Sequence, residues 1–252
     1  MDLELTGKVG LVTGASVGIG RGIAQALAAE GVQLAILARR GHLLESLADE
    51  IVSDGGLRPH ILVVDLTAAG AIERVRDEID RTFGRLDILV NNAGASRSIP
   101  IDAPEEPWIE SYELNFTAVR RLTHALLPLM RAQRFGRIVN LTGNSEPAGL
   151  NASSPAKAAV HSWSKGLSRL VAADGITVNS IAPGRINSEQ ILERLHPTPE
   201  SRARYIAENI PVGYFGEPHD VGYLVAFLAS PKARYLTGDV IYVDGGAHRF
   251  AF

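Results

Sequence analysis

The sequence contains no cysteine among its 252 residues. Disulfide bonds, thiolate catalysis and zinc–sulfur sites are therefore excluded. Basic runs are also lacking, and the net charge of −3 argues against nucleic acid or an anionic membrane as the main partner. No apolar run approaches membrane-spanning length, and residues 1–5 are acidic, unlike a signal peptide. No histidines or acids show metal-ligand spacing, so we expect no metal. These absences predict a soluble, cytoplasmic globular protein.

Short apolar runs of strand length alternate with helical patterns along most of the chain. Apolar residues make up 46% of it, enough for one sizeable core, and we expect a single domain over residues 1–252. Strand–helix alternation predicts an α/β fold, a doubly wound parallel sheet with helices on both faces. The expected strands are residues 9–12, 32–38, 61–65, 86–90, 137–141, 176–181 and 240–243. The expected helices are residues 21–30, 41–54, 71–83, 112–131 (bent near Pro128), 155–173 and 221–229.

The most informative stretch is the glycine-rich turn at residues 13–20. Gly14, Gly18 and Gly20 follow the first strand and precede a helix. Glycines at such a turn allow a tight bend, close approach of backbone to a phosphate and close packing of helix on strand. The positive end of the helix dipole favours a pyrophosphate there. A loop that only needs tight turns is the alternative, but the flanking strand and helix favour a dinucleotide site.

The end of the second strand indicates which dinucleotide binds. An NAD site needs a carboxylate at this position to accept a hydrogen bond from the ribose 2′-hydroxyl. Here the strand ends in Leu37, Ala38, Arg39 and Arg40, with two cations and no acid. A guanidinium complements a 2′-phosphate. We therefore predict NADP(H), with Arg39 as the contact; an ordinary solvated arginine pair is the alternative.

Residues 185–216 interrupt the alternation. This segment contains three prolines and two short helical patterns, at residues 189–195 and 200–209. It follows the sixth strand on the ligand side of the sheet, so a lid over the substrate is expected. A surface excursion without a role is the alternative.

Taken in order, these motifs resemble the short-chain dehydrogenase/reductase family over essentially the whole chain. The motifs are residues 13–20, Asp65 after the third strand, residues 91–94 after the fourth, Asn115, Lys157, Asn179, Pro183 with Gly184, and residues 243–246. The resemblance implies a Rossmann-type sheet of about seven strands, a nicotinamide cofactor and a homotetramer.

The resemblance also implies site residues. The turn residues would hold the pyrophosphate and adjacent ribose, and Asp65 and Leu66 would contact the adenine. Residues 92–94 would lie on the ribose and pyrophosphate side. Another set would line the nicotinamide, with Ser188 where the family has threonine. In chain order the cofactor residues are Gly14, Ser16, Gly18, Ile19, Gly20, Arg39, Asp65, Leu66, Asn92, Ala93, Gly94, Lys157, Pro183, Gly184, Ile186 and Ser188. Lys157 would also act in catalysis, with Asn115 holding a water that relays protons to it.

The sequence departs from the family where the proton donor is expected. The family has a tyrosine four residues before the lysine, one helical turn away, and a serine just after the fifth strand. Here these positions hold Ser153 and Gly143. A serine hydroxyl is far less acidic than a phenol and its side chain is shorter, so Ser153 is a poor replacement acid and is better explained as a helix cap or its neighbour.

Three explanations of this departure stay open. The enzyme can still reduce or oxidise a small carbonyl or alcohol, with the proton from Lys157, from a water held by Lys157 and Asn115, or from Tyr112, Tyr205 or Tyr214. Alternatively, the hydride acceptor is an iminium or activated alkene that needs no strong acid. Finally, the protein can be a catalytically silent NADP-binding or assembly protein.

The remaining polar and aromatic features are expected at surfaces. His124 and His161, both on helical patterns, are interpreted as surface or interface residues. Residues 248–252 end in aromatics that a monomer would expose, which favours burial between subunits.

Overall fold

The computed structural model describes residues 1–96, 98–143, 147 and 149–250. Seven parallel strands form one sheet in the order β3-β2-β1-β4-β5-β6-β7. Crossovers on either side of β1 make it the doubly wound sheet that the sequence predicts. The strands are β1 (Val9–Thr13), β2 (Gln33–Ala38), β3 (His60–Val63), β4 (Ile88–Asn91), β5 (Gly136–Leu141), β6 (Ile176–Pro183) and β7 (Val240–Val243).

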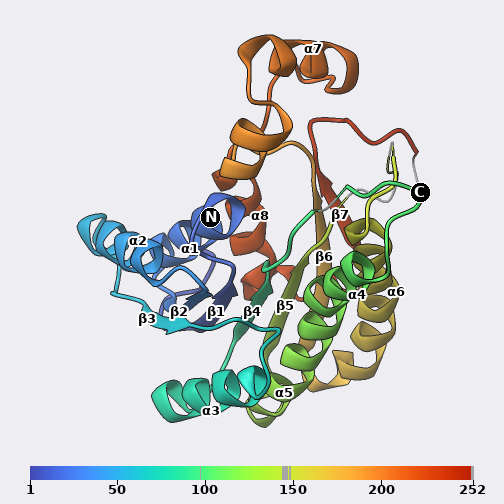
Figure 1. The fold of residues 1–252 in the computed structure, drawn as a ribbon. Helices are drawn as coiled ribbons and strands as arrows, with labels where there is room; N and C mark the ends of the chain where they lie inside the picture. Colours follow the sequence, from blue (N-terminus) through green and yellow to red (C-terminus); the bar gives the residue numbers. More distant parts are fainter. Residues whose placement is uncertain (97, 144–146, 148, 251–252) are drawn as a thin grey trace.

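Helices cover both faces of the sheet (Figure 1). The α-helices are α1 (Gly18–Ala29), α2 (Gly41–Ser53), α3 (Ala71–Phe83), α4 (Glu106–Tyr112), α5 (Ala118–Ala132), α6 (Ser153–Val171), α7 (Pro199–Asn209) and α8 (Pro218–Ala229). Short 3-10 turns lie at Ala172–Asp174 (η2) and Pro231–Ala233 (η4). Leucines and isoleucines of α1, α2 and α8 share one core cluster with the sheet, and those of α3, α5 and α6 share another. Each fully buried side chain of this size stabilises the fold by roughly 1.5–3 kcal/mol, so the sheet is held from both sides.

Helices α1 and α8 cross at unusually close range because both carry small residues at the crossing. A Cβ added to Gly22 of α1 would lie 2.5 Å from the Cβ of Pro218, the first residue of α8. A Cβ added to Gly222 would lie 2.9 Å from the Gly22 carbonyl oxygen. The helix that opens at the glycine-rich turn therefore rests on the last α-helix of the chain.

The helical stretch expected at residues 112–131 is longer and less regular than the sequence indicates. It starts at Glu106 with Pro107 in the first turn, passes through a π-helical segment, η1 (Glu113–Thr117), and continues as α5 through Pro128 to Ala132. The Asn115 Nδ2 group donates to the Ser111 carbonyl oxygen, 2.9 Å away. Single π turns inside helices often mark functional sites, and this one positions Asn115.

Residues 185–216 fold into a π-helical turn, η3 (Gln190–Leu195), and α7, which stands out from the body of the molecule in Figure 1. The Thr198 hydroxyl caps α7 by accepting from the Ser201 N–H at 3.1 Å. Ile191, Ile210 and Phe215 form a small buried cluster beneath it. No helix among the described residues is long and apolar enough to cross a membrane.

Candidate active site

A cavity of about 1030 Å³ opens at the carboxyl edge of the sheet, where parallel α/β sheets bind their ligands. Fourteen of the sixteen predicted cofactor residues line it: Gly14, Ser16, Gly18, Ile19, Gly20, Arg39, Asp65, Leu66, Asn92, Ala93, Gly94, Lys157, Pro183 and Ser188. Gly184 and Ile186 are not among its lining residues; Ile186 is buried and pairs with Gly216 through an isolated bridge. Arg40, noted in the sequence only as the second cation after β2, also lines the cavity. The sequence missed other lining residues, among them Glu110, Glu113, Leu114, Thr142 and Glu189.

The glycine-rich turn packs so closely on itself and on the loop after β4 that side chains at Gly14 and Gly20 would not fit. Gly14 has φ +66, and a Cβ there would lie 2.9 Å from both the Ala93 Cα and the Asn92 Nδ2. A Cβ on Gly20 would collide with the Gly14 carbonyl oxygen. Helix α1 starts at Gly18 without a side-chain cap, so its first-turn N–H groups face the cavity. This cradle fits a pyrophosphate.

Thr13 and Asn92 tie the turn to the end of β4. The Thr13 hydroxyl accepts from the Asn92 and Ala93 N–H groups, both at 3.0 Å, and donates to the Val90 carbonyl oxygen. The Asn92 amide donates to the carbonyl oxygens of Thr13 at 2.9 Å and Gly14 at 3.1 Å. Two loops that are distant in sequence are thereby held as one rigid wall of the cavity.

The two arginines at the end of β2 have different environments. The Arg39 side chain is 76% exposed, and its nearest acid is Asp65, whose carboxylate oxygen lies 3.8 Å away. Hydrogen bonds from Thr67 and the charge of Arg39 hold the pKa of Asp65 below its usual value. Arg40 is bound through both terminal nitrogens to Glu189, at 3.2 Å. Arg39 is thus the more available guanidinium for an incoming anion.

Lys157 lines the cavity and lies one turn into α6. Its Nζ donates to the main-chain carbonyl oxygen of Thr142 at 3.0 Å. Burial lowers the pKa of Lys157 to about 8 because a low-dielectric surrounding disfavours the charged form. A Cβ added to Gly143 would lie 3.6 Å from the lysine Cδ. Gly143 therefore stands beside the lysine, where the family resemblance places a serine.

Ser153 is the first residue of α6 and is 3% exposed. Its hydroxyl lies 2.6 Å from the Oδ1 of Asn151, which also accepts from the Ser153 N–H. The amide of Asn151 in turn donates to the Ser96 hydroxyl at 2.9 Å. Ser153 is not among the cavity's lining residues, and its contacts are those of a residue that organises a helix start.

Asn115 contacts the loop after β4, which lines the cavity, and does not line the cavity itself. Its Oδ1 accepts from the Ala95 N–H at 3.1 Å, and a Cβ on Gly94 would touch both that oxygen and the Lys157 Cε. The position that a Gly94 side chain would occupy is therefore bordered by both Asn115 and Lys157. Asn115 fixes the loop that borders the lysine.

His161 differs from its prediction as a surface or interface residue. It is half-buried one turn after Lys157, with its Nε2 2.7 Å from the Thr142 hydroxyl oxygen. Spacing along α6 places both side chains on one helix face, but the partner, Thr142, directly follows β5 and is not evident from the pattern.

The tyrosines considered as proton donors lie outside the cavity lining. Tyr205 packs against His196, with ring centroids 4.5 Å apart, and against Phe215 in the lid. Tyr214 is 63% exposed and Tyr112 is 39% exposed. Lys157 lines the cavity and has a pKa lowered to about 8, so its ammonium group can give up a proton near neutral pH.

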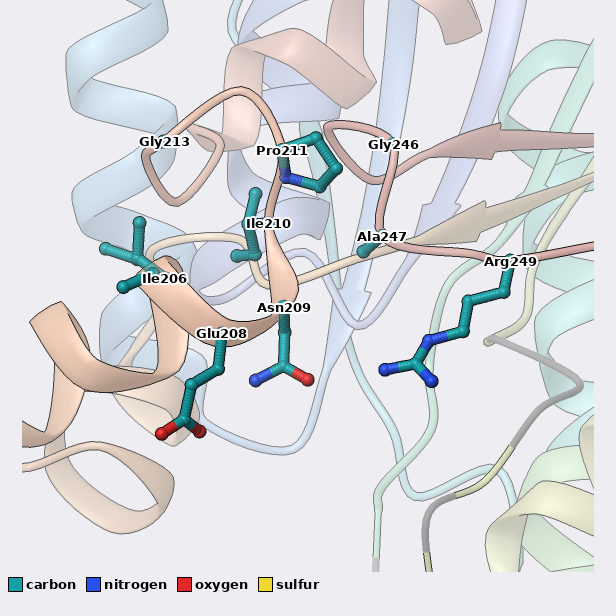
Figure 2. A pocket seen from close by; sticks show the side chains of 10 residues that line it. Ile206, Glu208, Asn209, Ile210, Pro211, Gly213, Gly246, Ala247 and Arg249 are labelled. Atoms are coloured by element: carbon teal, nitrogen blue, oxygen red, sulfur yellow. The ribbon is translucent and has the colours of Figure 1, made fainter.

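A second pocket, of about 430 Å³, lies between the end of α7 and the C-terminal tail (Figure 2). Its walls come from residues 206–211, Gly213, Gly246, Ala247 and Arg249, and none of them lines the larger cavity. Figure 2 shows the Arg249 side chain extending from the tail toward the α7 end, where Asn209 lies. This pocket holds neither Lys157 nor the glycine-rich turn, so it is not the site of cofactor chemistry.

Within the part of the chain that the structure describes, no group of three histidines or acids is placed to hold a metal ion.

The aromatic tail is described only to Phe250, which is 67% exposed; Phe252 lies outside the described residues.

Comparison with known proteins agrees with this geometry. Residues 14–248 match the family model described as enoyl-(acyl carrier protein) reductase. The chain is 38% identical to the 3-oxoacyl-[acyl-carrier-protein] reductase FabG of Vibrio cholerae, over 98% of this chain and 99% of that protein. Among solved structures it resembles the L-sorbose reductase of Gluconobacter frateurii in complex with NADPH and L-sorbose, with TM-score 0.94, 30% identity and coverage of 99% and 100%.

A second similar structure is YwfH, an NADPH-dependent reductase involved in bacilysin biosynthesis, with TM-score 0.90, 30% identity and coverage of 97% and 100%. Both similarities extend over nearly the whole chain, so they include the cofactor cradle, the lysine helix and the lid segment. With the family match and the FabG relative, they show that the chain is an oxidoreductase belonging to the short-chain dehydrogenase/reductase family.

Proposed function

We propose that this protein transfers hydride between NADP(H) and a small carbonyl or alcohol substrate, with Lys157 in place of a tyrosine as the proton donor. The observation that carries the proposal is the position of Lys157. Its amine is buried, lines the cofactor cavity, and has a pKa lowered to about 8. General acids work best when their pKa lies near the working pH.

NADP(H) is the cofactor. The cradle at Gly14 to Gly20 would receive the pyrophosphate, and Asp65 and Leu66 the adenine. Arg39 would contact the 2′-phosphate because it is exposed and only loosely paired, whereas Arg40 is already bound to Glu189. Pro183 and Ser188, at the far end of the same cavity, would border the nicotinamide, with Gly184 and Ile186 supporting them.

A bound reduced nicotinamide would supply hydride to the carbonyl carbon. As negative charge develops on the carbonyl oxygen, Lys157 gives it a proton: an N–H bond breaks, an O–H bond forms, and the ammonium becomes a neutral amine. A water held between Asn115 and Lys157 would then relay a proton from bulk solvent to the neutral amine. An imine that arrives already protonated would accept hydride without help from Lys157.

The lid, the subunits and the location complete the proposal. Residues 185–216 would cover the substrate, since Ser188 and Glu189 already border the cavity.

We expect a homotetramer that buries exposed side chains such as Phe250 and Tyr223, which is 66% exposed. Sedimentation as a monomer at micromolar concentration would contradict the tetramer. A cytoplasmic location stays a prediction from the sequence.

The test is NADPH consumption with a panel of ketones, aldehydes and imines, comparing wild type with Lys157→Met. We expect turnover of at least one carbonyl by wild type and a loss of about two to four orders of magnitude in the variant, the contribution typical of a general acid. NADPH binding, followed by fluorescence, should persist in both. Binding without turnover of any substrate by wild type would favour the alternative, a catalytically silent NADP-binding or assembly protein.

A further inference from the structure

Thr142 connects two side chains of α6 to the end of β5. Its carbonyl oxygen accepts from the Lys157 Nζ at 3.0 Å, and its hydroxyl oxygen lies 2.7 Å from the His161 Nε2. Thr142 is 2% exposed, so these contacts are shielded from solvent. Lysine and histidine thus converge on one residue, through its backbone and its side chain respectively.

The hydrogen-bond directions follow from the single hydroxyl proton of Thr142. The Ile181 carbonyl oxygen in β6 lies 3.0 Å from this hydroxyl and can only accept. With the proton directed there, the Thr142 oxygen accepts from His161, which places a proton on Nε2. Burial, and then the charge of Lys157, lower the pKa of His161. The imidazole is therefore neutral, with its one N–H pointed at Thr142.

We propose that His161 is a positioning residue for Lys157. The His161–Thr142–Ile181 chain clamps the end of β5 between α6 and β6. The carbonyl that holds the lysine amine belongs to the peptide group between Thr142 and Gly143. Because Gly143 lacks a Cβ, the backbone on the glycine side of this peptide group is unusually free to rotate. The orientation of the peptide group is therefore set from the Thr142 side, where His161 holds the threonine side chain.

This role is stronger here because the usual neighbour of the lysine is missing. Ser153 directs its hydroxyl to Asn151 rather than to Lys157. Among the described residues, the lysine amine donates its hydrogen bond to the Thr142 carbonyl oxygen. Loss of His161 would leave the amine attached to a peptide group held on one side only. The inference rests on the proposed function, in which Lys157 donates the proton.

The experiment compares His161→Leu, which removes the donor, with His161→Gln, which restores an amide N–H near the same position. We expect kcat to fall by about one to two orders of magnitude in His161→Leu, because a displacement near 1 Å can cost that much. His161→Gln should recover most of it, and the Kd for NADPH should stay near the wild-type value in both. His60→Leu is the matched control because it also removes a half-buried imidazole, on β3 and outside the cavity lining. The His60 Nε2 contacts Glu78 of α3 at 2.9 Å.

A measurement without cofactor or substrate separates this inference from the proposed function. The Lys157 side-chain ¹⁵N signal, assigned by its loss in Lys157→Met, should shift in His161→Leu and return in His161→Gln. An unchanged signal in His161→Leu, or equal loss of kcat without rescue in both variants, would overturn the positioning role. If wild type reduces no carbonyl, the proposed function fails, and the ¹⁵N comparison alone decides whether His161 positions the lysine.

Discussion

Arg40 and Glu189 form an ion pair across the mouth of the cofactor cavity, with both terminal nitrogens of the guanidinium bonded to one carboxylate oxygen at 3.2 Å. Arg40 follows β2 and Glu189 belongs to the lid segment, so the pair links the wall on the 2′-phosphate side to the lid. Both side chains are partly exposed. Such pairs contribute only about 0–1 kcal/mol, which an incoming phosphate can match.

Glu189→Gln should therefore strengthen NADPH binding. The variant releases Arg40 to assist Arg39 at the 2′-phosphate, and we expect the Kd for NADPH to fall by up to about fivefold, the equivalent of 1 kcal/mol. NADH lacks this phosphate and should bind almost as before. Fluorescence titration with both cofactors checks this. Asp174→Asn, which breaks an ion pair with Arg131 away from the cavity, serves as control; an equal gain for NADH would contradict the prediction.

Arg39→Asp should reverse the cofactor preference. It removes the cation expected at the 2′-phosphate and supplies a carboxylate for a ribose 2′-hydroxyl. We expect the Kd for NADPH to rise by about tenfold or more, since a charged hydrogen bond contributes about 1.5–3 kcal/mol, while NADH binding stays level or improves. Arg76→Asp on the exposed face of α3 is the control. Equal weakening of both cofactors would show that Arg39 does not select the phosphate.

The pH dependence of the reaction should report the lowered pKa of Lys157, about 8. Carbonyl reduction needs the ammonium form, so kcat should be level below that value and decline above it. Alcohol oxidation needs the neutral amine and should rise through the same range. Initial rates between about pH 6 and pH 10 in both directions check this. A reduction rate that stays level across the whole range would exclude Lys157 as the donor.

Lys157→Met should stabilise the cofactor-free protein. The folded-state pKa of Lys157 lies below its ordinary value of 10.5, so between about 8 and 10.5 the unfolded chain binds more protons, and wild-type stability rises with pH across that window. Below it the buried ammonium costs at most about 3 kcal/mol. We expect a higher Tm for Lys157→Met below pH 8, with the difference shrinking as pH approaches 10; a constant difference would refute the charge as its cause.

Ser153→Tyr tests whether the family's phenol can be restored. The substitution places a ring four residues before Lys157, on the same helix face, and breaks the contact of Ser153 with Asn151. Ser153→Phe is the matched control because it adds the ring without the hydroxyl. We expect carbonyl reduction by Ser153→Tyr to exceed that of Ser153→Phe. Equal rates in the two variants would show that the cavity does not admit a phenol as donor.

The regular elements were the most predictable part of the fold. The helix predicted at residues 71–83 is α3 to the residue, because Ile72, Val75 and Ile79 recur at helical spacing between two glycines that adopt left-handed conformations. The π turn at Glu113–Thr117 could not be predicted, since one extra residue in a helical turn leaves the apolar pattern almost unchanged.

Contacts between distant residues were the least predictable part of the site. The glycine-rich turn and Lys157 were recognised from local motifs. The bonds of Arg40 to Glu189 and of His161 to Thr142 join separate elements, and no spacing along the chain indicates them. Arg40 was noted for its charge, but its partner depends on how the lid segment folds over the sheet.

The close crossing of α1 and α8 has a consequence for biosynthesis. Chains are made from the N-terminus, and the surface that supports Gly22 arrives only with Pro218, near the end of the 252 residues. The nascent chain exposes the glycine-rich turn early but cannot seat the helix behind it until α8 has left the ribosome. A chain cut short before α8 would keep every glycine of the turn and lack its support. Tight cofactor binding would then require that synthesis has passed α8.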